Sequence, residues 1–230
     1  MTGVTRRGRS PEGRAEVRRE LVAAAVALFR SRGYEETTID DIAAAAGVGR
    51  RTFFRYFRSK EDAISPDHEA GLARVAEIFE TAHPTEPIAS LVLRAGETVF
   101  GLYFEDPQLS VARYRLTHEV PALRDRESAS VDHYRRLFNR HLRRRLTDEP
   151  DGELRAAVTA AAVVAAHNVA LRGWLAAGAP PDGLDECRAR YRKVVDMLPG
   201  EPPRNDLHAN DLHAVARRLE DAVVRLERRT

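Results

Sequence analysis

The sequence has very little cysteine and no long apolar run, and both absences narrow the classes of protein it can belong to. Cys187 is the single cysteine among 230 residues, which excludes an intrachain disulfide and a zinc cluster built on cysteine ligands. No continuous apolar run is long enough to cross a bilayer, and no apolar segment follows the arginines of the N-terminal MTGVTRRGRS. We therefore expect no membrane span, no signal peptide and a cytoplasmic protein.

Catalytic signatures and strand patterns are also missing. The sequence contains no G-x-S-x-G elbow, no phosphate-holding glycine loop and no H-E-x-x-H helix. We therefore predict that the protein is not an enzyme and has neither a metal site nor a cofactor. No alternation of apolar and polar residues between turns occurs, so the expected fold class is all-α, with about ten helices.

The charge is divided unevenly along the chain. Residues 1–60 carry 13 Lys and Arg against 7 Asp and Glu, whereas the remainder carries 24 against 28. Positive charge gathered at one end is the footprint expected of a segment that neutralises nucleic-acid phosphates, although a charge run alone is more often a solvated face.

Residues 38–60, TIDDIAAAAGVGRRTFFRYFRSK, have the pattern of two short helices joined by a tight turn. Thr38 and Asp41 have the spacing of a capping box, which predicts a helix starting at Ile39. Gly47 directly follows that helix, and glycine is the usual residue for the left-handed position that ends one.

The second of these helices starts near Gly49 and places Phe53 and Phe57, four residues apart, on its inward face. The opposite face gathers arginines with small and aromatic residues, namely Arg50, Arg51, Thr52, Phe54, Arg55 and Tyr56. This concentration indicates a helix-turn-helix unit that binds DNA.

From about Val17 to Asp62 the chain resembles the DNA-binding domain of the TetR family of bacterial transcriptional regulators. The resemblance rests on ALFRSRGYEETTIDDIAAAAGVGRRTFFRYFRSKED, where glycines, threonines and aromatics recur in the family's order. Two positions depart from the pattern: Gly49 stands where the family often has serine, and Phe54 stands where many members have tyrosine.

The recognition helix is expected to contact both bases and phosphates. A guanidinium can bond O6 and N7 of guanine together, so the arginines favour G·C pairs in each half-site, unless one or two of them touch phosphate alone. The resemblance implies DNA contacts for the residues that match the family's contacting positions, namely Arg50, Thr52, Phe54, Tyr56 and Lys60, and a phosphate contact for Thr38. We assign Tyr56 and Lys60 to phosphates as well. The predicted DNA-binding residues are Thr38, Gly49, Arg50, Arg51, Thr52, Phe54, Arg55, Tyr56 and Lys60.

Three domains are predicted. Residues 1–10 are expected to form a disordered basic arm, whose Arg6, Arg7 and Arg9 either enter a minor groove or make a loose tail with weak nonspecific attraction to DNA. Residues 11–60 form the three-helix DNA-binding domain, and residues 61–230 form a helical domain for ligand binding and dimerisation.

Apolar periodicity predicts the individual helices. The first begins between Ser10 and Arg14, with a buried stripe of Val17, Leu21, Ala24 and Leu28. Later helices are expected at Glu61–Ala82, Ile88–Phe104, Gln108–Thr117, Ala122–Leu146, Glu153–Ala177, Gly183–Leu198 and 206–229. The last either docks on its own core or forms a short coiled-coil seam.

Residues 158–177 are rich in alanine and valine, so the helix is apolar around most of its circumference and should be buried on several sides. The TetR resemblance implies a homodimer in which residues 153–177 and 183–198 of two subunits form a four-helix bundle. Two-fold symmetry suits a protein that reads paired half-sites.

The resemblance also implies a small-molecule pocket among the later helices. Such a pocket needs a few polar groups in an apolar helical cavity, and the candidates are Tyr103, Arg113, His118, His167, Asn168 and Arg172. The last three lie on the otherwise apolar helix 153–177, although a lone His or Asn there is more often a core residue. The stretch GVGRRTFFRYFRSKEDAI further resembles the subgroup of mycofactocin-associated regulators, which implies an acyl-CoA-like ligand.

The favoured function is a homodimeric repressor that a small molecule releases from a palindromic operator in double-stranded DNA. Two alternatives stay open: a DNA-binding regulator without small-molecule input, and an activator.

Overall fold

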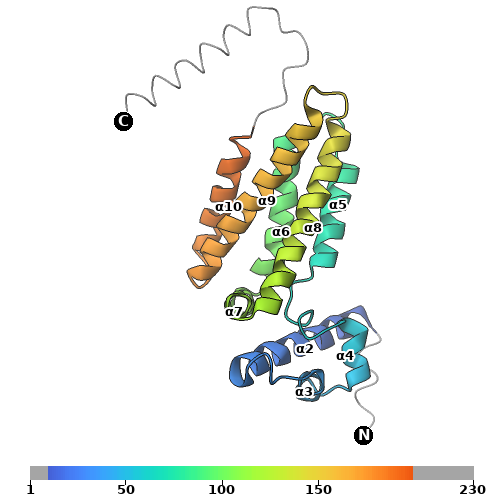
Figure 1. Ribbon diagram of the computed structural model, residues 1–230, viewed down its shortest axis with the longest axis vertical. Coiled ribbons are helices and arrows are strands. Elements are labelled where there is room, and N and C mark those ends of the chain that lie inside the picture. Colours follow the sequence, from blue (N-terminus) through green and yellow to red (C-terminus); the bar gives the residue numbers. More distant parts are fainter. Residues whose placement is uncertain (1–9, 199–230) are drawn as a thin grey trace, which may run out of the picture. The chain divides into compact units, whose positions relative to one another are not determined.

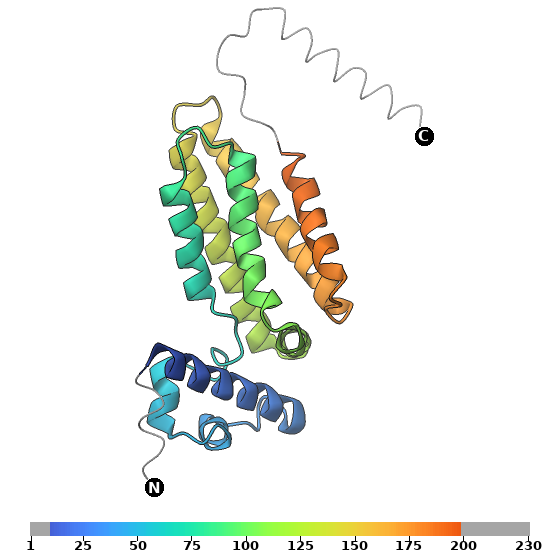
Figure 2. The ribbon, with the colours of Figure 1, turned by 180° about the vertical axis from the view of Figure 1, so that it is seen from behind.

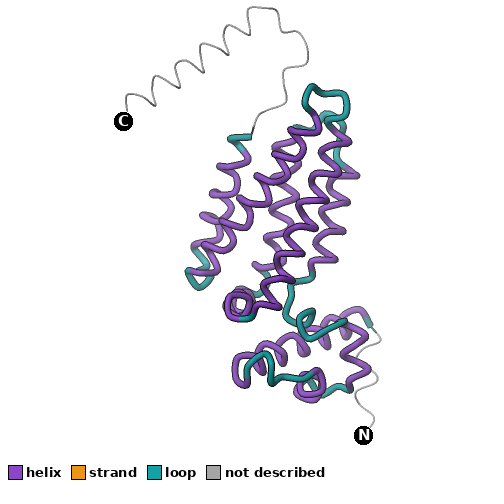
Figure 3. Tube along the Cα trace, in the orientation of Figure 1, coloured by secondary structure: helices purple, strands orange, loops and turns teal. Residues whose placement is uncertain are grey.

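The computed structural model describes residues 10–198, and every regular element in that range is an α-helix (Figures 1 and 3). The described residues up to Met197 belong to one compact unit. The predicted arm with Arg6, Arg7 and Arg9 and the predicted helix 206–229 lie outside the described residues. Nine helices are described: α2 Pro11–Arg32, α3 Ile39–Ala45, α4 Arg50–Tyr56, α5 His68–Thr81, α6 Ile88–Phe104, α7 Pro107–Glu119, α8 Pro121–Arg145, α9 Gly152–Ala176 and α10 Gly183–Val195.

Helix α2 begins where the sequence predicts, because Ser10 caps it. The Ser10 side chain accepts a hydrogen bond of 3.0 Å from the backbone N–H of Gly13. The predicted stripe is buried at Val17 and Leu21, and its other two members, Ala24 and Leu28, are partly buried and pack against the same core. The buried set is Val17, Leu21, Val22, Ala25, Val26 and Phe29, on which α3 and α4 pack.

The prediction of a helix from Glu61 was wrong at its start, since α5 begins at His68. Ser59 does cap the backbone N–H of Asp62, at 3.3 Å, but residues 60–64 form turns only. Pro66 explains the delay, because it lacks an N–H and disfavours the helical conformation of the residue before it. Asp67 then caps the true helix by accepting from the N–H of Ala70 at 3.1 Å.

The five helices predicted between Ile88 and Leu198 are all present as α6 to α10, with ends that shift by at most three residues. Figures 1 and 2 show α5, α6, α8, α9 and α10 running alongside one another, and α9 packs against both α8 and α10. Helix α10 is held to α6 by Tyr191, whose hydroxyl donates to the carbonyl of Val92 at 2.6 Å. Gly96 is required at this crossing, since a Cβ there would overlap the Tyr191 ring.

Candidate nucleic-acid interface and interior cavity

The turn between α3 and α4 has the geometry that the sequence predicts. Thr38 Oγ1 accepts from the N–H of Asp41 at 3.1 Å, and the Asp41 carboxylate accepts from the N–H of Thr38 at 2.9 Å. Gly47 has a φ of +66°, and the N–H of Val48 donates to the Ala43 carbonyl at 2.9 Å. This pair of features closes α3 in a Schellman turn and fixes where α4 begins.

Helix α4 buries one side and exposes the other. Phe53 and Phe57 are buried in the core of the head, while Phe54 keeps 46% of its surface exposed. Gly49 is the N-cap and supplies no side-chain hydrogen bond, so the first N–H groups of the helix are open to an external acceptor. The exposed or half-buried residues of this face are Arg50, Arg51, Thr52, Phe54, Arg55 and Tyr56.

The arginines of α4 make solvent-exposed contacts. Arg50 lies 3.0 Å from the carboxylate of Asp40 on α3, and its guanidinium stacks over Phe54 at 5.2 Å. Arg55 stacks on Tyr56 at 5.1 Å and donates to its hydroxyl at 3.2 Å. Within the described residues Arg51 makes no ion pair. Exposed pairs such as Arg50–Asp40 contribute about 0–1 kcal/mol to stability, so contacts with DNA phosphates or bases can replace them.

Lys60 is tied into the fold of the head. Its ammonium donates to the carbonyls of Tyr34 and Thr37, at 2.7 and 3.2 Å, and lies 4.0 Å from the centroid of the Tyr34 ring. A lysine has three donors, so one remains for a phosphate. Its role on DNA stays a prediction, together with those of the other residues of this face.

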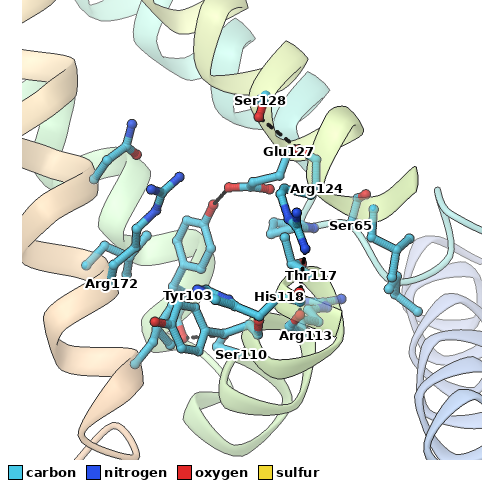
Figure 4. A pocket seen from close by; sticks show the side chains of 17 residues that line it. Ser65, Tyr103, Ser110, Arg113, Thr117, His118, Arg124, Glu127, Ser128 and Arg172 are labelled. Atoms are coloured by element: carbon cyan, nitrogen blue, oxygen red, sulfur yellow. Dashed lines mark hydrogen bonds between the residues drawn. The ribbon is translucent and has the colours of Figure 1, made fainter. Parts of the chain in front are cut away.

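A cavity of about 140 Å³ opens inside the bundle, between α7, α8 and α9 (Figure 4). It brings together five of the six residues predicted to bind a ligand: Tyr103, Arg113, His118, Asn168 and Arg172. The sixth, His167, lines a smaller neighbouring cavity of about 30 Å³, which also touches Tyr103, Glu127 and Asn168. Their role in ligand binding remains a prediction.

Arg113 supplies a buried positive charge to the larger cavity. Its Nε is buried without a hydrogen-bond partner among the described residues. Burial, and secondarily the charge of Arg18 on α2, lowers the pKa of Arg113 to about 10. The guanidinium is therefore still charged at neutral pH and can bind an anion.

Glu127 faces the same cavity and was missed in the sequence. It accepts from the Tyr103 hydroxyl at 3.4 Å and lies 3.4 Å from Nε2 of His68. Burial raises the pKa of Glu127, but contact with His68 and Tyr103 outweighs burial and leaves it below its ordinary value. Its segment of α8, PALRDRESAS, is mostly charged and polar, so it looks like a solvated face and gives no signal for a buried acid.

The smaller cavity contains a neutral histidine. The His167 ring is stacked on Phe100, with 3.9 Å between centroids, and burial lowers its pKa to about 4. Its Nε2 has no hydrogen-bond partner among the described residues.

Within the single subunit, helix α9 is buried on one side only, so the subunit itself does not supply the expected cover on the other sides. Leu154, Val158 and Val169 are exposed, the last by 70%, and Met197 beyond α10 is exposed by 76%. In the described part of the chain, α9 is also the one helix that is long and apolar enough to cross a membrane, by length and composition alone. Here it is a bundle helix whose other side lies in the core, at residues such as Val163 and Leu171.

Two family models match the chain. Residues 21–63 match the model described as bacterial regulatory proteins, tetR family, and residues 87–199 match the MftR C-terminal domain. MftR of Mycobacterium tuberculosis is named a putative mycofactocin biosynthesis transcriptional regulator, so the second match agrees with the resemblance to mycofactocin-associated regulators.

Relatives and solved structures point the same way. The regulator TcmR of Streptomyces glaucescens is 34% identical over 46% of this chain and 50% of its own length. The chain thus spans about half the length of several curated relatives, but TtgR of Pseudomonas putida is 30% identical over 83% of this chain and 95% of its own length.

The fold has relatives among solved structures. The crystal structure of FadR from Bacillus subtilis in complex with stearoyl-CoA is 17% identical, with a TM-score of 0.53 over 83% of this chain and 99% of that one. These relatives are transcriptional regulators and not enzymes. The chain belongs to the TetR family of bacterial regulatory proteins.

Proposed function

We propose that the protein is a homodimeric transcriptional repressor that binds a palindromic operator through α4 and is released by a small molecule. The exposed face of α4 carries this proposal, because Arg50, Arg51 and Arg55 stand together on a seven-residue helix whose opposite side is locked by Phe53. Residues 11–60 bind DNA, residues 61–230 bind the ligand and dimerise, and the protein acts in the cytoplasm, where its operator lies.

Footprinting of the DNA upstream of the gene for this protein tests the proposal. We expect a protected palindrome whose half-sites contain G·C pairs and lie about one helical turn or a small multiple apart. An Arg51→Ala, Arg55→Ala double variant should lose the footprint while keeping its helical content by circular dichroism. A footprint that the double variant retains would contradict the role of α4.

Dimerisation through α9 and α10 is supported by exposed apolar side chains on α9 and by the exposed Met197, which follows α10. Leu154, Val158 and Val169 would remain in water in an isolated subunit, and burying them against a second copy is favourable by about 25 cal/mol per Å². Light scattering should give twice the mass of 25.7 kDa for the wild type and the monomer mass for Val169→Glu. An unchanged mass for Val169→Glu would contradict this interface.

The effector is proposed to be an amphipathic anion of the acyl-CoA type. The Nε of Arg113 is buried without a hydrogen-bond partner among the described residues, and an anionic group could accept from it at the edge of an apolar bundle. Calorimetry with fatty acyl-CoA thioesters tests this, with Arg113→Met as the variant that keeps length and loses charge. We expect at least tenfold weaker binding to the variant, equivalent to about 1.4 kcal/mol. Equal binding would exclude Arg113 as the anion site.

A further inference from the structure

The polar side chains around the larger cavity divide into two groups, and the division limits what can contact a ligand. Hydroxyls of the lining already donate to backbone carbonyls: Ser110 to Tyr103, Thr117 to Arg113 and Ser128 to Arg124, at 2.8–2.9 Å. Arg124 likewise donates to the carbonyl of His118 at 2.6 Å (Figure 4). These groups are used within the protein.

Glu127 is the acceptor that is left under-satisfied. Its contacts to Tyr103 and His68 are both 3.4 Å, whereas hydrogen bonds to a carboxylate normally measure about 2.5–2.9 Å. The His68 contact has no hydrogen-bond geometry, since neither ring nitrogen of His68 makes a hydrogen bond among the described residues. A carboxylate can accept about four hydrogen bonds, so Glu127 has capacity to spare.

The free capacity of Glu127 faces the cavity. Its side chain keeps 26% of its surface exposed. Figure 4 shows its carboxylate pointing toward Tyr103 and into the cavity that both residues line. Because Glu127 also lines the smaller cavity, it stands at the junction between the polar and the more apolar compartments. A ligand that spans both compartments must pass beside this carboxylate.

The charge of the cavity decides which donor fits. Arg113, Arg124 and Arg172 outnumber Glu127 in the lining, which disfavours a ligand with a net positive charge. The donor is therefore a neutral group on an anionic molecule.

We infer that the effector donates a hydrogen bond from a hydroxyl or amide N–H group to Glu127, while its anionic group binds Arg113. The inference rests on the proposed effector binding. It narrows the class of effector from amphipathic anions in general to those with a hydrogen-bond donor between the anionic group and the apolar tail. Hydroxy fatty acids have this arrangement, and plain fatty acids lack it.

The test compares octanoate with 3-hydroxyoctanoate on the full chain. Trp174 is the single tryptophan and is buried. It stands between Leu171 and Leu175 in the sequence, and both leucines line the cavity, so Trp174 fluorescence can report whether the cavity is occupied. Calorimetry provides a second readout. We expect the wild type to bind 3-hydroxyoctanoate about tenfold more tightly, as a hydrogen bond to a charged group allows.

Three variants separate the role of Glu127 from a general loss of folding. Glu127→Gln keeps the shape of the side chain but removes its charge. It should reduce the preference for 3-hydroxyoctanoate over octanoate to about twofold or less. Tyr103→Phe removes the hydroxyl that competes for Glu127 and should increase the preference for 3-hydroxyoctanoate. Asp132→Asn alters an acid elsewhere on α8, paired with Arg135 and Arg136, and should leave the preference unchanged.

Each outcome has a definite meaning. Equal affinity of the wild type for the two acids, or a preference that survives Glu127→Gln, overturns the inference and leaves anion binding intact. Tighter binding of octylamine than of either acid would overturn the inference, because the cavity would then select a cation. If no probe binds the wild type, the proposed effector site fails together with the inference.

Discussion

Arg50 of α4 reaches back to Asp40 of α3, with 3.0 Å between Nη1 and Oδ2, so an arginine that we propose to read DNA is paired with an acid of the same head. Both side chains are more than half exposed, so the pair is weak. On DNA, base or phosphate contacts of the Arg50 guanidinium would compete with its contact to Asp40. We therefore expect the acid to oppose binding twice, by holding Arg50 and by repelling phosphates.

Asp40→Asn should increase DNA affinity by about two- to fivefold, because it removes both effects. Fluorescence anisotropy with a labelled operator measures the change, and the gain should shrink as salt is raised. Asp132→Asn is the matched control, since it removes one charge from α8, outside the reading head. Weaker binding by Asp40→Asn would mean that the acid positions Arg50 for DNA.

Arg50→Ala should weaken operator binding by about 1–3 kcal/mol and relax the preference at one base pair of each half-site. Competition between operators that differ at single positions measures both effects. Uniform weakening on every competitor would show that Arg50 contacts phosphate only.

Lys60→Ala should affect folding as well as DNA binding. The ammonium joins the Tyr34 and Thr37 carbonyls to the end of the reading unit, so its loss should reduce the free energy of unfolding by about 1–3 kcal/mol. DNA affinity of the remaining folded protein should fall uniformly and with a flatter salt dependence. Urea unfolding with and without operator separates the two. An unchanged unfolding midpoint would contradict the structural role of Lys60.

His167 should make the fold sensitive to acid. Its pKa of about 4 in the folded protein lies below the ordinary value of 6.5, so it is neutral in both states above pH 6.5. As the pH falls from 6.5 toward 4, the unfolded chain takes up a proton that the folded chain refuses. The free energy of unfolding should therefore fall over this window, by up to about 3 kcal/mol.

His167→Phe keeps a ring against Phe100 and should flatten the pH dependence of unfolding between about pH 4.5 and 6.5. Urea denaturation at several pH values measures the slope for each protein. Equal slopes for wild type and variant would show that His167 titrates normally.

The sequence is most informative where a few local rules decide the structure. The Thr38–Asp41 capping box, Gly47 at a left-handed φ and the buried Phe53 and Phe57 were all predicted from neighbouring residues, and each is present. Pro66 shows where such rules compete: the Ser59 cap favoured a helix start, but the proline prevented a helix until Asp67.

The cavity could be predicted only in part. Asn168 and Arg172 stand out as polar residues on an apolar helix, and the structure brings them together with Tyr103 and Arg113. Glu127 does not stand out, because its burial depends on how α8 turns against α6 and α9. That rotation is set by packing between helices distant in sequence, which a local pattern does not contain.

The most direct test of the central claim, that α4 reads DNA as part of a symmetric dimer, is selection of binding sites from random duplex DNA. The wild type should enrich a palindrome with G·C pairs in both half-sites, and variants with Arg50, Arg51 or Arg55 changed to alanine should each lose a defined part of it. Enrichment of an unpaired site, or of no site, would contradict the account.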